Sequence, residues 1–101
     1  MSRAVYCYAF AEGISLAEVQ DSLILATFCA EGLHGRARVR LDAGFHLDEG
    51  RRACVVDAST PVGQTVAQIF TGLLIREFGD DAFSVERAGD RPSTTPDARD
   101  P

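Results

Sequence analysis

The segment from residue 57 to 65, Asp-Ala-Ser-Thr-Pro-Val-Gly-Gln-Thr, has the residue types best suited to hold a small ligand. It combines hydroxyl groups with a predicted helix start, where free backbone amides and the helix dipole attract an anion. Ser59, Thr60 and Gly63 are therefore the candidate anion-binding residues. A purely structural interpretation is favoured, in which Ser59 or Thr60 caps the helix and Asp57 either fixes the turn or pairs with an arginine. The segment also lacks the lysine of a phosphate-binding loop.

Other residue types that perform catalysis or bind metals are scattered along the chain. The two histidines, His34 and His46, lie at no metal-ligand spacing from each other or from a cysteine. Cys7, Cys29 and Cys54 form no C-x-x-C pair, and their apolar surroundings indicate small buried hydrophobes in a reducing compartment. We expect no metal and no cofactor. The sequence favours a non-catalytic protein, with a catalytic site shared across an interface as the alternative.

Composition limits the partners that the chain can take. With 101 residues it is one domain, and its net charge of −5 disfavours binding to duplex nucleic acid. All ten basic residues are arginine. No apolar stretch approaches the ~20 residues that cross a bilayer, and the N-terminus does not resemble a secretory signal. We therefore expect a cytoplasmic protein that does not contact membranes.

The strongest pattern in the chain is an unbroken alternation of polar and apolar residues from Arg36 to Leu47. A period of two over this length predicts a strand with one wet and one apolar face. The remaining elements are predicted from caps, turns and apolar runs. They are strands over 3–11, 52–57 and 82–87, a helix from the Ser15 cap to about 31 and a helix from 60 to 79. We expect Gly32 to end the first helix, and Gly50 to take a positive φ in a turn at 48–50.

This order of strand, helix, strand, strand, helix, strand resembles the ferredoxin-like βαββαβ arrangement. The resemblance implies an α+β domain over residues 1–88, with a four-stranded antiparallel sheet and two helices packed on one face. Residues 89–101 are polar and rich in proline, so we expect a disordered tail there. Many unrelated activities share this fold, so it does not predict a function.

The first strand has no polar face, which points to an unusual surface. Tyr6, Tyr8 and Phe10 alternate with small residues. Because small residues suit a closely packed helix layer, we place the three aromatic rings on the open face of the sheet; the opposite orientation is the alternative. The alternating strand would set Arg38 and Arg40 beside them, and aromatic and arginine side chains are enriched at protein interfaces.

The first helix carries a second apolar surface. Leu25, Phe28 and Cys29 fall on or beside its expected wet side. Both surfaces favour a protein-interaction module that binds a second copy of itself or another protein, as a homodimer or a small subunit of a larger assembly. The alternative is single-stranded nucleic-acid binding through the aromatic and arginine face. The negative net charge and the absence of an aromatic residue from the 52–57 strand disfavour it.

Overall fold

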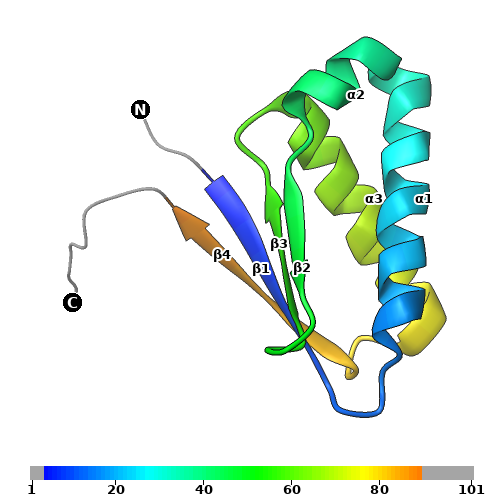
Figure 1. Ribbon diagram of the computed structural model, residues 1–101, viewed down its shortest axis with the longest axis vertical. Helices are drawn as coiled ribbons and strands as arrows, with labels where there is room; N and C mark the ends of the chain where they lie inside the picture. Colours follow the sequence, from blue (N-terminus) through cyan, green and yellow to red (C-terminus); the bar gives the residue numbers. More distant parts are fainter. Residues whose placement is uncertain (1–3, 90–101) are drawn as a thin grey trace.

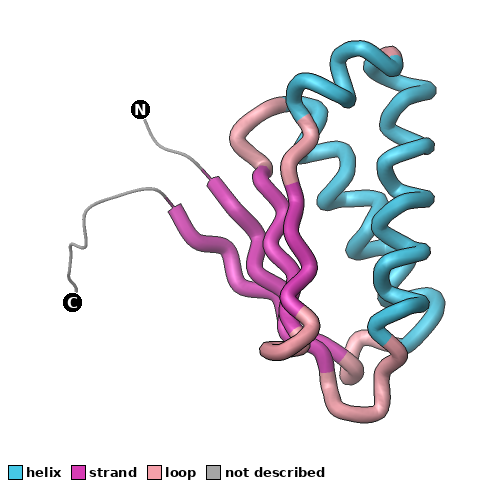
Figure 2. The backbone as a smooth tube through the Cα atoms, in the orientation of Figure 1, coloured by secondary structure: helices cyan, strands magenta, loops and turns pink. Residues whose placement is uncertain are grey.

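The computed structural model describes residues 4–89, so the tail predicted at 89–101 lies outside the described residues except for Gly89. The chain forms an α+β structure with a four-stranded antiparallel sheet in the order β2-β3-β1-β4 and three helices. The helices lie on one side of the sheet and leave its other face open (Figures 1 and 2). The elements are β1 (Ala4–Phe10), α1 (Leu16–His34), α2 (Arg36–Asp42), β2 (Phe45–Asp48), β3 (Ala53–Asp57), α3 (Pro61–Phe78) and β4 (Phe83–Gly89).

The aromatic side chains of the central strand β1 face the helices. Tyr8 is 1% exposed and Phe10 is 7% exposed, and Tyr6 packs against the same core. The open-face position predicted for these three rings is therefore wrong. The physical reason is volume, because large rings fill the space between the sheet and two helices. Small residues such as Cys7 and Ala9 cover the open face instead.

The hydroxyl group of Tyr8 is satisfied inside the core. It shares a hydrogen bond of 2.8 Å with Oγ1 of Thr71 and donates a longer one, 3.4 Å, to the backbone carbonyl of Ala67. Its ring packs edge-on against Phe70 with the ring centroids 4.9 Å apart. These contacts let the core keep a tyrosine without an unpaired polar atom.

The alternating segment Arg36–Leu47 is mainly helical, and the prediction of one long strand there is wrong. Gly35, with φ of 89°, ends α1, and α2 begins at the next residue. Arginine, alanine and leucine are strong helix formers, so their propensity opposes the strand pattern. Val39 is the buried residue of α2, and the Arg38 Nε atom lies 3.2 Å from a carboxylate oxygen of Asp42, one turn away.

The two long helices begin where the capping residues predict. The Ser15 hydroxyl accepts a hydrogen bond from the first turn of α1, and Thr60 does the same for α3. The expected closing residue of α1 was wrong, because the helix runs past Gly32 and ends at Gly35. Gly79, with φ of 87°, ends α3 as predicted.

The β2–β3 hairpin is tied to the loop that precedes α1. Arg52, and not Gly50 as predicted, holds the positive φ of this turn, at 52°. Its guanidinium group donates hydrogen bonds to the backbone carbonyls of Ala11, at 2.7 Å, and Ile14. The left-handed backbone at Arg52 therefore coincides with a side chain that connects two distant loops.

Burial of ionisable groups on β1 and β3 predicts a loss of stability at alkaline pH. Burial raises the pKa of the Cys54 thiol from 9.0 to about 11, and burial also raises the pKa of Tyr8. Between these two thiol values the unfolded chain loses a proton that the folded chain retains, so the free energy of unfolding falls as the pH rises. We expect a decrease of about 2 kcal/mol from Cys54 alone between pH 9 and pH 11. Denaturant unfolding at several pH values measures this, and a Cys54→Val variant should show a shallower decrease.

Candidate functional site

The side of α1 that faces away from the sheet is apolar. Phe28 is 61% exposed, Leu25 is 48% exposed and Ile24 is 43% exposed, whereas the opposite side of the helix is buried. We call this surface the α1 outer face and define it by Ile24, Leu25, Phe28 and Cys29, all of them exposed. The exposure predicted for Leu25, Phe28 and Cys29 is confirmed, and their role in an interface remains a prediction. The general expectation that the cysteines are buried is correct for Cys54 and wrong for Cys29.

The two ends of the α1 outer face carry opposite charges. Glu18 and Asp21, together with Glu77 from the end of α3, line a shallow hollow beside Leu25. At the other end α2 presents three exposed arginines, Arg36, Arg38 and Arg40. The 19 residues of α1 separate the two ends by about 28 Å, so the acidic and basic groups do not pair with each other within one chain, and Arg38 is paired with Asp42.

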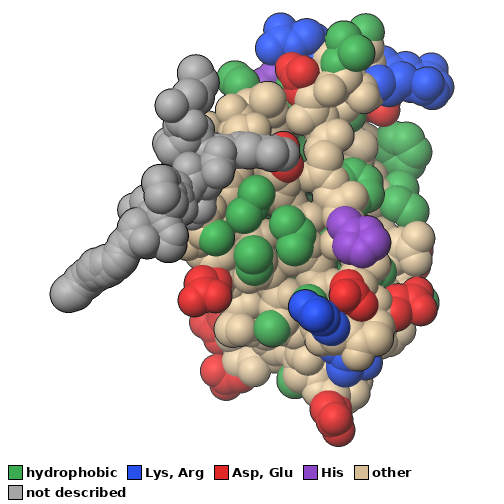
Figure 3. All heavy atoms as spheres, turned by 60° about the vertical axis from the view of Figure 1, so that its left-hand side comes forward, with side chains coloured by type: hydrophobic (Ala, Val, Ile, Leu, Met, Phe, Trp, Pro, Cys, Tyr) green, Lys and Arg blue, Asp and Glu red, His purple; other side chains and the backbone are tan. Residues whose placement is uncertain are grey.

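The residues predicted to form a sheet-face interface are not brought together. Arg38 and Arg40 lie on α2, and Tyr8 and Phe10 lie in the core. Small side chains occupy the centre of the open face, where Figure 3 shows a modest hydrophobic cluster. Stacking of nucleic-acid bases needs exposed rings. The open face therefore lacks the surface on which the nucleic-acid alternative depended.

The predicted anion-binding residues serve the start of α3. Thr60 Oγ1 accepts a hydrogen bond from the Gly63 amide at 3.0 Å, and the Ser59 amide donates to an Asp57 carboxylate oxygen at 2.9 Å. Two amides that would face an anion thus already have partners, and a carboxylate stands beside them. The geometry matches the structural interpretation of this segment, and the anion site stays a prediction.

Sequence reasoning missed two exposed leucines on the helical side of the molecule. Leu41 was assigned to the apolar face of the expected strand, yet on α2 it is 81% exposed. Leu33 is 73% exposed because α1 continues past the glycine that was expected to end it. Helix propensity within residues 36–42 is the signal that would have revealed the first of these positions.

The titratable residues do not converge on a reactive centre. His34 Nε2 lies 2.8 Å from Thr65 Oγ1 and joins the end of α1 to α3. His46 is exposed on β2, opposite Val55. Within residues 4–89, no cluster of three or more histidine, cysteine, aspartate or glutamate side chains is arranged to hold a metal ion.

Comparison of the sequence with protein-family models and with curated proteins finds no match. In the described part of the chain, neither long helix combines the length and the apolarity that crossing a bilayer requires.

Proposed function

We propose that the chain is a non-catalytic protein-interaction module that pairs with a second copy of itself through the α1 outer face. The observation that carries this proposal is the exposure of Phe28, Leu25 and Ile24 on one side of a single helix. Water contact with adjoining apolar side chains is unfavourable, and clustered exposure of this kind is typical of an association surface. A helix that is apolar on both sides is normally covered on both sides.

The charges at the two ends of the α1 outer face favour a second copy as the partner. In a twofold dimer whose symmetry axis lies perpendicular to α1, the two α1 helices run antiparallel, so the acidic end of each copy meets the basic end of the other. Glu18 and Asp21 of each chain would then face the α2 arginines of its partner. Complementary potentials of this kind favour the correct orientation and accelerate encounter.

The shape of α1 also suits this arrangement. Phe28 and Gly32 lie one turn apart, and no atom lies within 4 Å of where a Cβ of Gly32 would be. In an antiparallel pair centred on Phe28, Ile24 of each copy rests over Gly32 of the other, and Leu25 stays within the length of the partner's α1. A large side chain opposite a glycine lets two helices approach closely.

Two further assignments belong to this proposal. The strand order β2-β3-β1-β4 supports a ferredoxin-like arrangement in which α2 is an addition before β2. The free Cys7, Cys29 and Cys54 support a reducing, cytoplasmic environment. Neither assignment predicts the activity, which depends on the surface.

The test is the oligomeric state of the full chain, measured by light scattering and sedimentation over a range of concentrations. We expect a dimer for the wild type, and we expect Phe28→Glu to raise its dissociation constant about a thousandfold. The twofold axis brings two copies of residue 28 into one interface, and each contributes about 2 kcal/mol. A wild-type chain that stays monomeric at high micromolar concentration contradicts the homodimer.

Val55→Glu is the matched control, because Val55 is 38% exposed on the opposite, open face of the sheet. This variant should remain dimeric if the α1 outer face is the interface. Dissociation by Val55→Glu but not by Phe28→Glu would instead place the contact on the sheet.

A further inference from the structure

A groove runs between α3 and the β1–β4 side of the sheet. It consists of two adjoining cavities that share Tyr6 and Gln68, and we call it the α3–β4 groove. The first cavity is apolar and has a volume of about 350 Å³; the second is polar, with about 220 Å³. Ala67, Thr71 and Val85 line the apolar end, and Ala58, Gln64 and Arg87 line the polar end.

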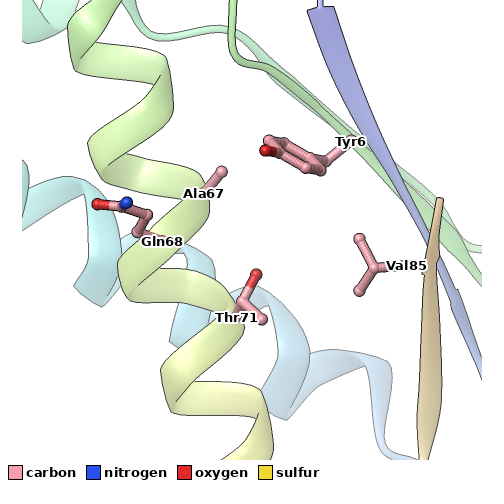
Figure 4. Close-up of a pocket in the computed structure, with 5 residues that line it drawn as sticks. All are labelled: Tyr6, Ala67, Gln68, Thr71 and Val85. Carbon is pink, nitrogen blue, oxygen red and sulfur yellow. The ribbon is translucent and has the colours of Figure 1, made fainter. Parts of the chain in front are cut away.

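The groove lies at the edge of the sheet, where the edge strand β4 and the helix α3 both contribute lining residues. α1 packs against α3 on the side marked by the contact between His34 and Thr65, so it does not cover β4. Val85 remains 40% exposed although it lies on the helix side of the sheet, paired with the buried Tyr8. Figure 4 shows the side chains of Tyr6 and Val85 directed into the space in front of α3.

Three polar side chains along this groove have hydrogen-bond donors without a partner among the described residues. In the part of the chain that the structure describes, the Tyr6 hydroxyl, the Gln68 amide and the Arg87 guanidinium form no hydrogen bond or ion pair. By contrast, the Thr71 hydroxyl is engaged with Tyr8, and the Gln64 amide donates to the Ala58 carbonyl. The unpaired Arg87 guanidinium therefore offers a charged hydrogen-bond donor, and Tyr6 and Gln68 offer neutral donors, beside the apolar cavity.

We propose that the α3–β4 groove binds a small amphipathic carboxylate, with its carboxylate at Arg87 and its apolar body between Tyr6, Thr71 and Val85. A guanidinium group donates two parallel hydrogen bonds to a carboxylate, and Tyr6 and Gln68 add donors nearby. The volume of the apolar end falls within the range of small-molecule sites. This proposal does not depend on the dimer, because it uses a different flank of the molecule.

The test is calorimetric titration of the full chain with octanoate, and with octanol and octylamine as probes of matched length. We expect saturable binding of octanoate, weaker binding of octanol and none of octylamine. Arg87→Gln should weaken octanoate about tenfold and leave octanol unchanged, since it removes only the charged contact. Arg51→Gln is the control, because Arg51 is also exposed but lies in the β2–β3 turn.

Two further variants locate the site. Val85→Phe should fill the apolar end and abolish octanoate binding, whereas Phe28→Glu, on the α1 outer face, should leave it unchanged. The proposal is overturned if octanoate does not bind, if octanol binds equally well, or if the Arg87 and Arg51 variants behave alike. Loss of binding in Phe28→Glu but not in Val85→Phe would also overturn it, because the ligand would then occupy α1.

Discussion

Replacing Gly63 with alanine is expected to destabilise the fold by about 3 kcal/mol or more. A Cβ at this position would lie 2.0 Å from the backbone oxygen of Asp57 and 3.2 Å from the Cα of Ala58. The backbone cannot easily move away, because the Asp57 amide donates to the Gly44 carbonyl and the Ala58 amide donates to the Ala4 carbonyl, both at 2.8 Å. The first turn of α3 therefore approaches the end of β3 at a distance that only glycine permits.

Gly72→Ala is the control for this substitution within the same helix. Gly72 is exposed, and no atom lies within 4 Å of the position that its Cβ would take. Alanine there should stabilise α3 by about 0.5–1 kcal/mol, because glycine loses more backbone entropy in a helix. Denaturant titration of both variants measures the difference. If the two variants have equal midpoints, the close approach at Gly63 does not limit stability.

Replacing Tyr8 with alanine is expected to cost about 3–5 kcal/mol, the range found when a buried aromatic side chain is truncated. The ring is 1% exposed, packs against Phe70, and its hydroxyl is bonded to Thr71. Truncation leaves a cavity between the sheet and α3 and removes the partner of a threonine hydroxyl. Thermal and denaturant unfolding measure the loss.

Two milder variants separate the parts of this effect. Tyr8→Phe retains the ring and should cost about 1 kcal/mol, the contribution of one hydrogen bond. Val55→Ala, on the open face, should cost less than Tyr8→Ala because Val55 is 38% exposed. If Tyr8→Ala and Val55→Ala were equally mild, the aromatic residues of β1 could not be facing the helices.

The parts of the fold that follow from local chemistry could be predicted from the sequence. Ser15 and Thr60 marked the starts of the two long helices, and Gly79 marked the end of α3. These residues act through backbone geometry within one turn, so a short window of sequence contains the necessary information. The α+β class with a four-stranded antiparallel sheet followed from the order of the elements.

The predictions that were wrong concern segments in which two sequence patterns compete, or in which the structure depends on residues far away along the chain. In residues 36–42 the alternation of arginines with apolar residues fits a strand, but helix propensity prevails and only Val39 is buried. The orientation of β1 was undetermined because both of its faces are apolar. Tyr8 faces the helices, where its ring contacts Phe70 and its hydroxyl bonds to Thr71. These partners lie more than 60 residues further along the chain, so no local sequence pattern predicts the contacts.

Of the two candidate surfaces, only the α1 outer face could be predicted, because its residues all lie on one helix. Leu25, Phe28 and Cys29 share a helix whose boundaries were nearly correct, so their exposure followed from the helical period. The α3–β4 groove joins Tyr6, Gln68 and Arg87 from three elements. Its polar and apolar ends arise from tertiary packing, and the sequence shows no spacing that would reveal them.

The position of β1 between β3 and β4 has a consequence for the newborn polypeptide. β1 needs two neighbouring strands, and both are synthesised after it, because β3 begins at Ala53 and β4 begins at Phe83. Until both have been made, the backbone hydrogen-bonding groups of β1 lack their strand partners, and assembly of the sheet waits for distant segments to meet. A chain that stopped before Phe83 would keep one long edge of β1 unpaired, which invites aggregation and makes such fragments natural clients of chaperones.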